Sequence, residues 1–256
     1  MIRGLVEEHV VTTVDGTRGL ALDEAGVARA SLPIPRSARE ALAAQVRKLG
    51  EGAQAVLHAL AVARAELALD ALGQVLGRSD NELLAAIEDL VAAGLARERR
   101  VEASVLVDVA RVRARDAIYR ELPEAERARL HRALGEALER LGRKRLHLVL
   151  DALARHFDLG YVPGKAYPYL LRSGCRLMDR SFVREALAAF DRAVALEPDA
   201  RELVPLDDAD RALCELLLKR AEALEHLGDW HQLDADLQRA RGLAEALGDD
   251  RLLGRA

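Results

Sequence analysis

The feature that most constrains the fold is a pair of amphipathic segments between Tyr167 and Pro198. The first reads Leu170-x2-Ser173-Gly174-x2-Leu177, and the second reads Ala186-x3-Phe190-x2-Ala193-x4-Pro198. Gly174 and Ala186 are small enough for two helices to touch, and Phe190 is large enough to fill the space between them. Proline lacks a backbone N–H, so we expect Pro198 to end the second helix. The spacing predicts a helical hairpin.

This spacing resembles the tetratricopeptide repeat (TPR), a module that binds protein partners and carries out no chemistry. A second, degenerate copy reads Leu217-x2-Arg220-Ala221-x2-Leu224, Gly228-Asp229-Trp230, then Leu233-x3-Leu237-x2-Ala240. Arg220 stands where the pattern has an apolar residue, and no proline follows. Gly174 and its counterpart Ala221 are 47 residues apart, against about 34 in the standard repeat. We attribute the excess to a polar, acidic loop from Asp199 to Arg211.

Length and composition favour helical hairpins in more than one subdomain. The 256 residues approach the upper limit for one core. Hydrophobic residues make up 50% and aromatic residues 3%, and the abundant Ala and Leu are strong helix formers. The C-terminus, Gly254-Arg255-Ala256, carries no polar capping helix. A repeat array that ends there exposes an apolar face, so we expect a fragment, or a chain that continues or pairs as an oligomer.

The charge distribution and the cysteines indicate which partners and which cellular location the chain can have. Residues 1–110 have a net charge of -4, residues 111–180 of +7 and residues 181–256 of -7. The basic middle is either neutralised by the acidic ends or binds an anionic partner. Cys175 and Cys214 have no metal or redox spacing, which indicates a reducing cytosol. The N-terminus lacks a signal-peptide core, and no run of 18 apolar residues predicts a membrane span. We expect a cytoplasmic protein.

Three regions follow along the chain. Residues 1–30 read as a ribbon and linker left from a preceding domain, with β-branched residues 5–14, a turn at Asp15-Gly16 and a return over residues 18–22. Residues 31–122 begin with a stiff extended linker, Ser31-Leu32-Pro33-Ile34-Pro35, and predict helices over 37–49, 53–63, 67–76 and 80–93. Ser79 and Glu82 form a capping box before the last of these helices. Strands are predicted over 95–100 and 104–109, followed by a helix over 112–122.

Three short helices followed by a β-ribbon are the winged-helix layout, a helix-turn-helix variant. Residues 123–256 then predict helices over 124–141 and 146–159, followed by the TPR-like segments 165–178 and 182–196. The predicted fold class is therefore all-α: a winged-helix subdomain with a small β-ribbon, followed by TPR-like helical hairpins in an α-solenoid.

The order of these parts resembles the arm of STAND-type bacterial regulatory ATPases. The segments that carry the resemblance are Arg36 to Leu49, Asp80 to Gly94 and Arg111 to Arg132, within residues 30–245. In that family a P-loop ATPase precedes a winged helix and TPR-like repeats, and relatives include maltose-regulon-type activators and large serine/threonine kinases and cyclases. This chain has neither G-x-x-x-x-G-K-[ST] nor a kinase signature. The resemblance implies the regulatory arm without the catalytic part.

DNA binding through the winged helix is the alternative function. A recognition helix needs cations or amides that face bases and phosphates. Residues 80–94 contain no Lys or Arg but four carboxylates, Asp80, Glu82, Glu88 and Asp89, so we expect this helix not to bind DNA. Arginines at 111, 113 and 115 and the run Arg143-Lys144-Arg145 either bind an anion or are solvated helix ends.

The remaining candidate site is the inner groove of the repeats. Equivalent positions, one residue around from the packing stripe, are held by Leu171, Cys175 and Met178 in the first repeat and by Leu218, Glu222 and Glu225 in the second. One wall is apolar and the other acidic, which suits a helix or peptide with a basic end. Alternatively, residues 146–159 cover the apolar wall. Candidate partners are a protein or peptide, among them the ATPase or kinase domain of the same parent protein.

No catalytic, cofactor or metal site is predicted. The seven histidines do not cluster at ligand spacing: His226 and His231 are five residues apart and His147 and His156 nine. No histidine accompanies a Ser or Cys nucleophile. The carboxylates lie in helix rows where i,i+4 pairing with cations is the usual role. We therefore expect a protein that is not an enzyme.

Overall fold

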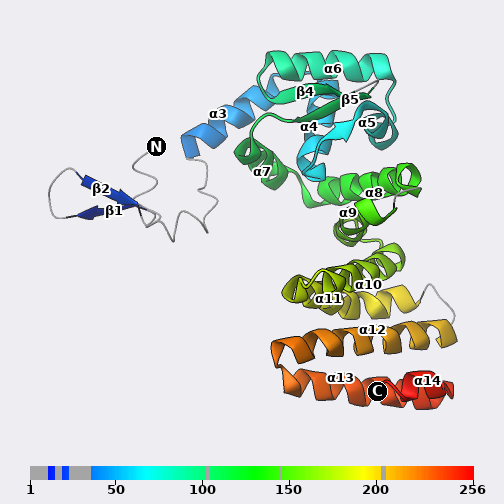
Figure 1. Ribbon diagram of the computed structural model, residues 1–256. Coiled ribbons are helices and arrows are strands. Elements are labelled where there is room, and N and C mark those ends of the chain that lie inside the picture. The colour runs from blue at the N-terminus through cyan, green and yellow to red at the C-terminus, as the bar shows by residue number, and fades with distance from the viewer. Residues whose placement is uncertain (1–10, 15–18, 23–35, 102–103, 144–145, 203–205) are drawn as a thin grey trace. The chain divides into compact units, whose positions relative to one another are not determined.

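The computed structural model describes residues 11–14, 19–22, 36–101, 104–143, 146–202 and 206–256 (Figure 1). The chain divides into two compact units, Met1–Glu124 and Ala125–Ala256. Within the described residues, twelve helices, α3 to α14, dominate and a three-stranded sheet lies in the first unit. The predicted all-α class is confirmed at this level.

The first unit begins with a two-stranded antiparallel ribbon. Strand β1 (Val11–Val14) pairs with β2 (Gly19–Leu22), and Val14 lies opposite Gly19. This pairing agrees with the strands predicted on either side of Asp15-Gly16. The predicted turn itself and the proline-containing linker lie outside the described residues.

Five helices build the body of the first unit. They are α3 (Arg36–Arg47), α4 (Glu51–Ala63), α5 (Leu69–Leu76), α6 (Asp80–Ala92) and α7 (Val112–Glu121). Helix α4 is central: every residue from Ala59 to Ala63 is buried, as are Val56 and Leu57. The predicted capping box is present at the start of α6, where the Ser79 N–H and hydroxyl donate to Glu82 Oε2 over 2.9 and 2.6 Å.

A small antiparallel sheet has the order β3-β5-β4. The predicted ribbon is formed by β4 (Ala96–Val101) and β5 (Ser104–Val109), with Ala96 opposite Val109. The third strand, β3 (Leu67–Ala68), corrects the prediction of one helix over residues 67–76. Leu67 and Ala68 pair with Val107 and Leu106 of β5, so a partner distant in sequence makes these two residues a strand.

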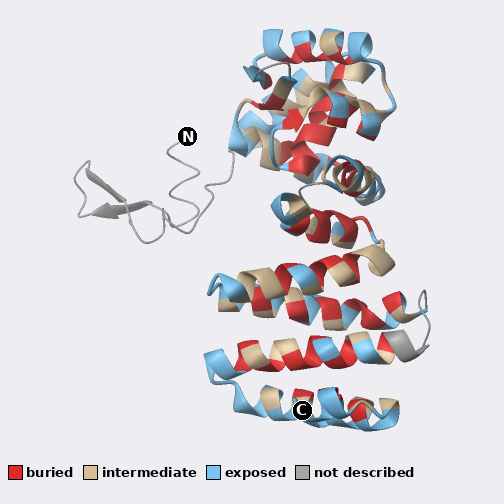
Figure 2. Cartoon of the chain, turned by 45° about the vertical axis from the view of Figure 1, so that its right-hand side comes forward, coloured by how far each residue is buried: buried red, intermediate tan, exposed pale blue. Residues whose placement is uncertain are grey.

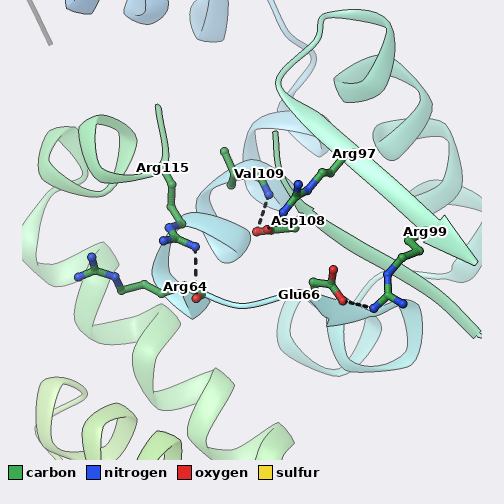
Figure 3. A network of polar contacts seen from close by, with 7 residues as sticks. All are labelled: Arg64, Glu66, Arg97, Arg99, Asp108, Val109 and Arg115. Atoms are coloured by element: carbon green, nitrogen blue, oxygen red, sulfur yellow. Dashed lines mark hydrogen bonds and ion pairs between the residues drawn. The ribbon is translucent and has the colours of Figure 1, made fainter. Parts of the chain in front are cut away.

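Polar contacts tie this sheet together at its surface (Figure 3). Arg97 donates to Asp108 over 3.0 Å, and the other Asp108 oxygen accepts the Val109 N–H. Arg99 donates to Glu66 over 2.6 Å, which joins β4 to the residue before β3. Arg97 and Arg99 therefore have carboxylate partners, although their side chains remain largely exposed.

The second unit is a succession of helices that pack against their sequence neighbours from α9 onward. The helices are α8 (Glu124–Leu141), α9 (Leu146–Leu159), α10 (Pro163–Asp179), α11 (Val183–Arg201), α12 (Leu206–Leu227), α13 (Trp230–Leu247) and α14 (Asp250–Leu253). Buried positions recur along each long helix (Figure 2). The bounds of α8 and α9 agree with the prediction.

One turn geometry recurs between these helices. A left-handed residue follows α9, α10, α12 and α13, namely Tyr161, Ser181, Gly228 and Gly248, with φ between 54° and 75°. At each turn the N–H of this residue bonds to the carbonyl three residues back, and the next N–H bonds five residues back. This pair of bonds is the Schellman motif, which satisfies the last carbonyls of a helix. It reverses the chain within a few residues.

The predictions at Pro198 and after it were wrong. Helix α11 continues through Pro198 to Arg201, and α12 begins at Leu206, so most of the predicted loop from Asp199 to Arg211 is helical. A proline removes one hydrogen bond from a helix, but other contacts hold the final turn. Glu197 pairs with Arg201 over 3.1 Å, and Ala200 is buried.

The predicted contact between Gly174 and Phe190 is present. Phe190 is fully buried, and a Cβ added to Gly174 would overlap its ring. Gly135 is related in the same way to Phe157, which is also fully buried. Helices α8 to α11 thus depend on glycines that face aromatic rings.

We predict that Gly174→Ala lowers the free energy of unfolding by about 1–3 kcal/mol, because the added methyl group overpacks the α10–α11 contact. Urea unfolding followed by circular dichroism measures this. The control is Gly242→Ala on α13, where the new Cβ meets nothing within 4 Å. It should stabilise the helix by up to about 1 kcal/mol. Equal effects of the two variants would contradict the packing argument.

Candidate functional site

The six predicted groove residues differ in accessibility. On α10, Leu171, Cys175 and Met178 are half-buried. On α12, Leu218 is buried in the core, Glu222 is half-buried and Glu225 is exposed. Leu218 therefore belongs to the packing of the unit and is not available to a partner.

Cys175 and Glu222 belong to one local environment formed by α10 and α12. Burial raises the pKa of the Cys175 thiol; Lys219 opposes this shift, and Asp179 and Glu222 add to it. Helices α10 and α12 are in contact, and Lys219 and Glu222 lie close enough to Cys175 to influence its thiol. Because the thiol stays protonated near neutral pH, Cys175 has the character of a packing residue rather than a nucleophile.

Lys219 was missed by the sequence analysis and changes the charge of the acidic wall. Its Nζ lies 3.0 and 2.9 Å from the two Glu222 oxygens. Arg255 approaches the same carboxylate to 3.9 Å. The i,i+3 spacing of Lys219 and Glu222 was the available signal. The wall at Glu222 is thus a neutralised ion pair, and the exposed Glu225 keeps the acidic character.

Arg220, the mismatch in the predicted degenerate repeat, connects three helices. Its guanidinium bonds to both oxygens of the buried Asp236 on α13 and reaches Asp191 on α11 over 3.1 Å. Hydrogen bonding to Asp236 is the first cause that raises the Arg220 pKa. Removing one partner of a buried ion pair strongly destabilises the folded state, because the other charge is left buried without compensation. Arg220, which departs from the apolar pattern, therefore links α12 to α11 and α13 through hydrogen-bonded ion pairs.

The equivalent position in the first repeat makes a similar connection. Ser173 donates to Asp151 on α9 over 2.7 Å. Arg176 pairs with the other oxygen of the same carboxylate, and it also donates to the His147 carbonyl over 3.0 Å. Polar residues of these two helices thus link each of them to its neighbours, while Leu171 and Cys175 are partly buried against the core.

A cavity of about 250 Å³ lies among α10, α11 and α12. The lining residues are Gly164, Tyr167, Pro168, Glu197, Ala200, Arg201, Ala209 and Ala212. Pro168 is one and two helical turns from Leu171 and Cys175, so these three residues share a face of α10. The cavity therefore lies on the face of α10 that carries two of the predicted groove residues, nearer the beginning of the helix.

Two buried histidines meet between α8 and α9. The Nδ1 atoms of His131 and His156 are 2.8 Å apart, and Arg155 lies 3.2 Å from His156 Nε2. Burial lowers the pKa of His131 to about 4 and that of His156 to about 2, and Arg155 acts in the same direction on both. Sequence spacing did not pair them, since 25 residues separate them. Both rings are neutral at pH 7, and the contact is a hydrogen bond that protonation disrupts.

The described residues hold no group of three or more metal-ligating side chains. In the same part of the chain, no helix is long and apolar enough to cross a membrane. The carboxylates of α6 at positions 80, 82, 88 and 89 are exposed. Arg111 and Arg113 are also exposed, and Arg115 donates to the Arg64 carbonyl over 3.3 Å. Lys144 and Arg145 lie outside the described residues.

Comparisons of this chain with family models, with curated proteins and with solved structures find no match.

The histidine pair predicts a pH dependence of stability. Because folding lowers both pKa values below the ordinary value of about 6.5, the unfolded chain binds more protons in acid. The contribution of the two neutral histidines to the free energy of unfolding is complete above about pH 6.5. It should fall by up to about 1.4 kcal/mol per pH unit for each histidine as the pH drops toward 4.

Urea unfolding at several pH values between 7 and about 4.5 tests this linkage. The variant His131→Leu/His156→Leu should lose less stability over that interval than the natural chain. The surface variant His226→Leu/His231→Leu, which changes two exposed histidines, should behave like the natural chain. Identical slopes for all three proteins would refute the assignment.

Proposed function

We propose that the chain is a non-catalytic regulatory arm of a larger bacterial cytoplasmic signalling protein, which binds a protein or peptide through TPR-like hairpins. The single observation that carries this proposal is the surface of α10 and α12 where the half-buried Cys175 lies near the Lys219–Glu222 pair. Leu171 shares a face of α10 with Cys175, and a cavity among α10, α11 and α12 lies nearer the beginning of α10. Apolar surface rimmed by charges is typical of protein-interaction sites.

The first unit fits the winged-helix half of the proposal. Its elements follow in the order α4, β3, α5, α6, β4, β5, and the sheet order is β3-β5-β4. A helix-turn-helix with a trailing ribbon has this organisation. In a STAND-type parent protein, this unit relays the state of the attached ATPase or kinase domain to the hairpins.

The second unit fits the TPR-like half. Antiparallel helices joined by one recurring turn, with small residues at Gly174 and Ala221, support a helical-repeat reading. The departures from the standard repeat are the long helices α11 and α12 and the Arg220–Asp236 pair. The long helices account for the 47 residues between Gly174 and Ala221.

Local chemistry favours binding over catalysis. The Cys175 thiol has a raised pKa, whereas a nucleophilic cysteine needs a lowered one. His131 and His156 are buried against each other with lowered pKa values. These groups have the character of packing and hydrogen-bonding residues, so the groove is the site on which the proposal depends.

The test is affinity capture from the cells that encode the chain, followed by quantitative mass spectrometry. Glu222→Lys with Glu225→Lys should reduce capture of specific partners about tenfold or more, because reversal at 222 breaks the Lys219 pair and places like charges together. The matched control is Glu185→Lys with Glu245→Lys, at exposed positions on α11 and α13. It should keep the natural partners. If the Glu222→Lys/Glu225→Lys variant captures the same partners as the natural chain, these residues do not take part in partner binding.

DNA binding is tested separately by mobility shift on duplex DNA. We expect no shift at about 50 mM salt, since a DNA-binding surface built on α6 presents only carboxylates as charged groups. The reference variant Asp80→Ala/Glu88→Ala removes two of these carboxylates. Tight binding that weakens steeply between about 50 and 200 mM salt would favour the DNA-binding alternative.

A further inference from the structure

The cavity between α10, α11 and α12 combines an apolar wall with charged side chains. Its apolar lining comes from Gly164, Pro168 and three alanines, Ala200, Ala209 and Ala212, together with the ring of Tyr167. The charged residues that line it are Glu197 and Arg201. A site of this kind accepts a side chain that is apolar along its length and polar at its end.

Two carboxylates share one guanidinium at this cavity. Arg201 donates to Glu197 over 3.1 Å and also pairs with Asp210. Glu215, one turn beyond Ala212 on α12, is exposed and acts electrostatically on Tyr167 together with Glu197. The three residues joined by these contacts, Glu197, Asp210 and Arg201, carry a net charge of -1. Glu197 itself is only 7% exposed, so its charge is poorly screened by solvent.

The Tyr167 hydroxyl reinforces this electrostatic asymmetry. Tyr167 is 9% exposed, and its hydroxyl has no hydrogen-bond partner among the described residues. Two carboxylates and one guanidinium, those of Glu197, Glu215 and Arg201, act electrostatically on it. A buried polar group without a partner costs free energy. A ligand group that hydrogen-bonds to the Tyr167 hydroxyl would remove this cost.

We propose that this cavity is the anchor site for a lysine or arginine side chain of a partner peptide that lies in the α10–α12 groove. The aliphatic stem packs on Pro168, Tyr167 and the alanines, and the cationic head lies toward Glu197 and Glu215. The inference rests on the proposed function and names the partner class as a basic peptide. An apolar anchor gains only from burial, whereas a cationic one also offsets the excess negative charge.

The test uses the full chain, labelled with ¹⁵N, and three peptides of the form Ac-Ala-Ala-X-Ala-Ala-NH₂. X is lysine, norleucine or glutamate, so the peptides differ in head-group charge at similar length. We expect the lysine peptide to bind about tenfold more tightly than the norleucine peptide, and the glutamate peptide to bind least. The amide signals of Gly164, Ala200 and Ala212 should shift on binding.

Matched variants locate the binding. Glu215→Gln should weaken lysine-peptide binding about threefold, with norleucine binding unchanged, whereas Glu245→Gln on α13 should have no effect. Ala212→Leu fills the cavity and should abolish binding of both peptides, while Ala235→Leu at an exposed position of α13 should not. Thermal unfolding of each variant verifies that it is folded.

Equal affinity for the lysine and norleucine peptides, preference for glutamate, or binding that survives Ala212→Leu would each overturn the inference. Its failure can be told apart from failure of the proposed function. If Glu222→Lys/Glu225→Lys abolishes partner capture but the lysine peptide does not bind, the groove function stands and the anchor is wrong. If the lysine peptide binds in the cavity but capture is unchanged, the anchor stands and the proposed function is wrong.

Discussion

The second unit depends on one constraint, which is the left-handed residue that ends α9, α10, α12 and α13. This residue lets the following N–H reach back five residues, so the helix ends with satisfied carbonyls and the chain reverses at once. Two of these positions are Tyr161 and Ser181, although a non-glycine residue in this conformation costs about 1–2 kcal/mol. Once the helices are antiparallel, Gly174 and Gly135 permit the close approach of Phe190 and Phe157.

Local sequence signals predicted most of the helices because their periodicity and end signals agree. Leucine spacing gave the bounds of α8 and α9, and Ser79 with Glu82 fixed the start of α6. The errors occurred where tertiary contacts decide the structure. Pro198 does not end α11, because the Glu197–Arg201 pair and the buried Ala200 hold the last turn. Strand β3 exists through its pairing with β5, a contact that no local pattern reveals.

The environment of the candidate groove residues was less predictable than the fold, because it depends on which side chains pair. Helical spacing placed Cys175 and Glu222 near each other, but it assigned Leu218 to the surface although this residue is buried. The neutralisation of Glu222 involves Lys219 and Arg255, which is 33 residues away. In the same way, Arg220 looked like a defect in the repeat until Asp236 and Asp191 were seen around it. Charge counts along a sequence do not reveal such pairs.

The positions of the two cysteines have a practical consequence. Cys214 is fully buried and its thiol donates to the Ala240 carbonyl, whereas Cys175 is half-buried beside Lys219 and Glu222. The two thiols therefore differ in their access to a water-soluble alkylating reagent. The chain carries a built-in chemical reporter, since the modification rate at Cys175 measures whether the face between α10 and α12 is occupied. Cys214 serves as the internal standard for unfolding.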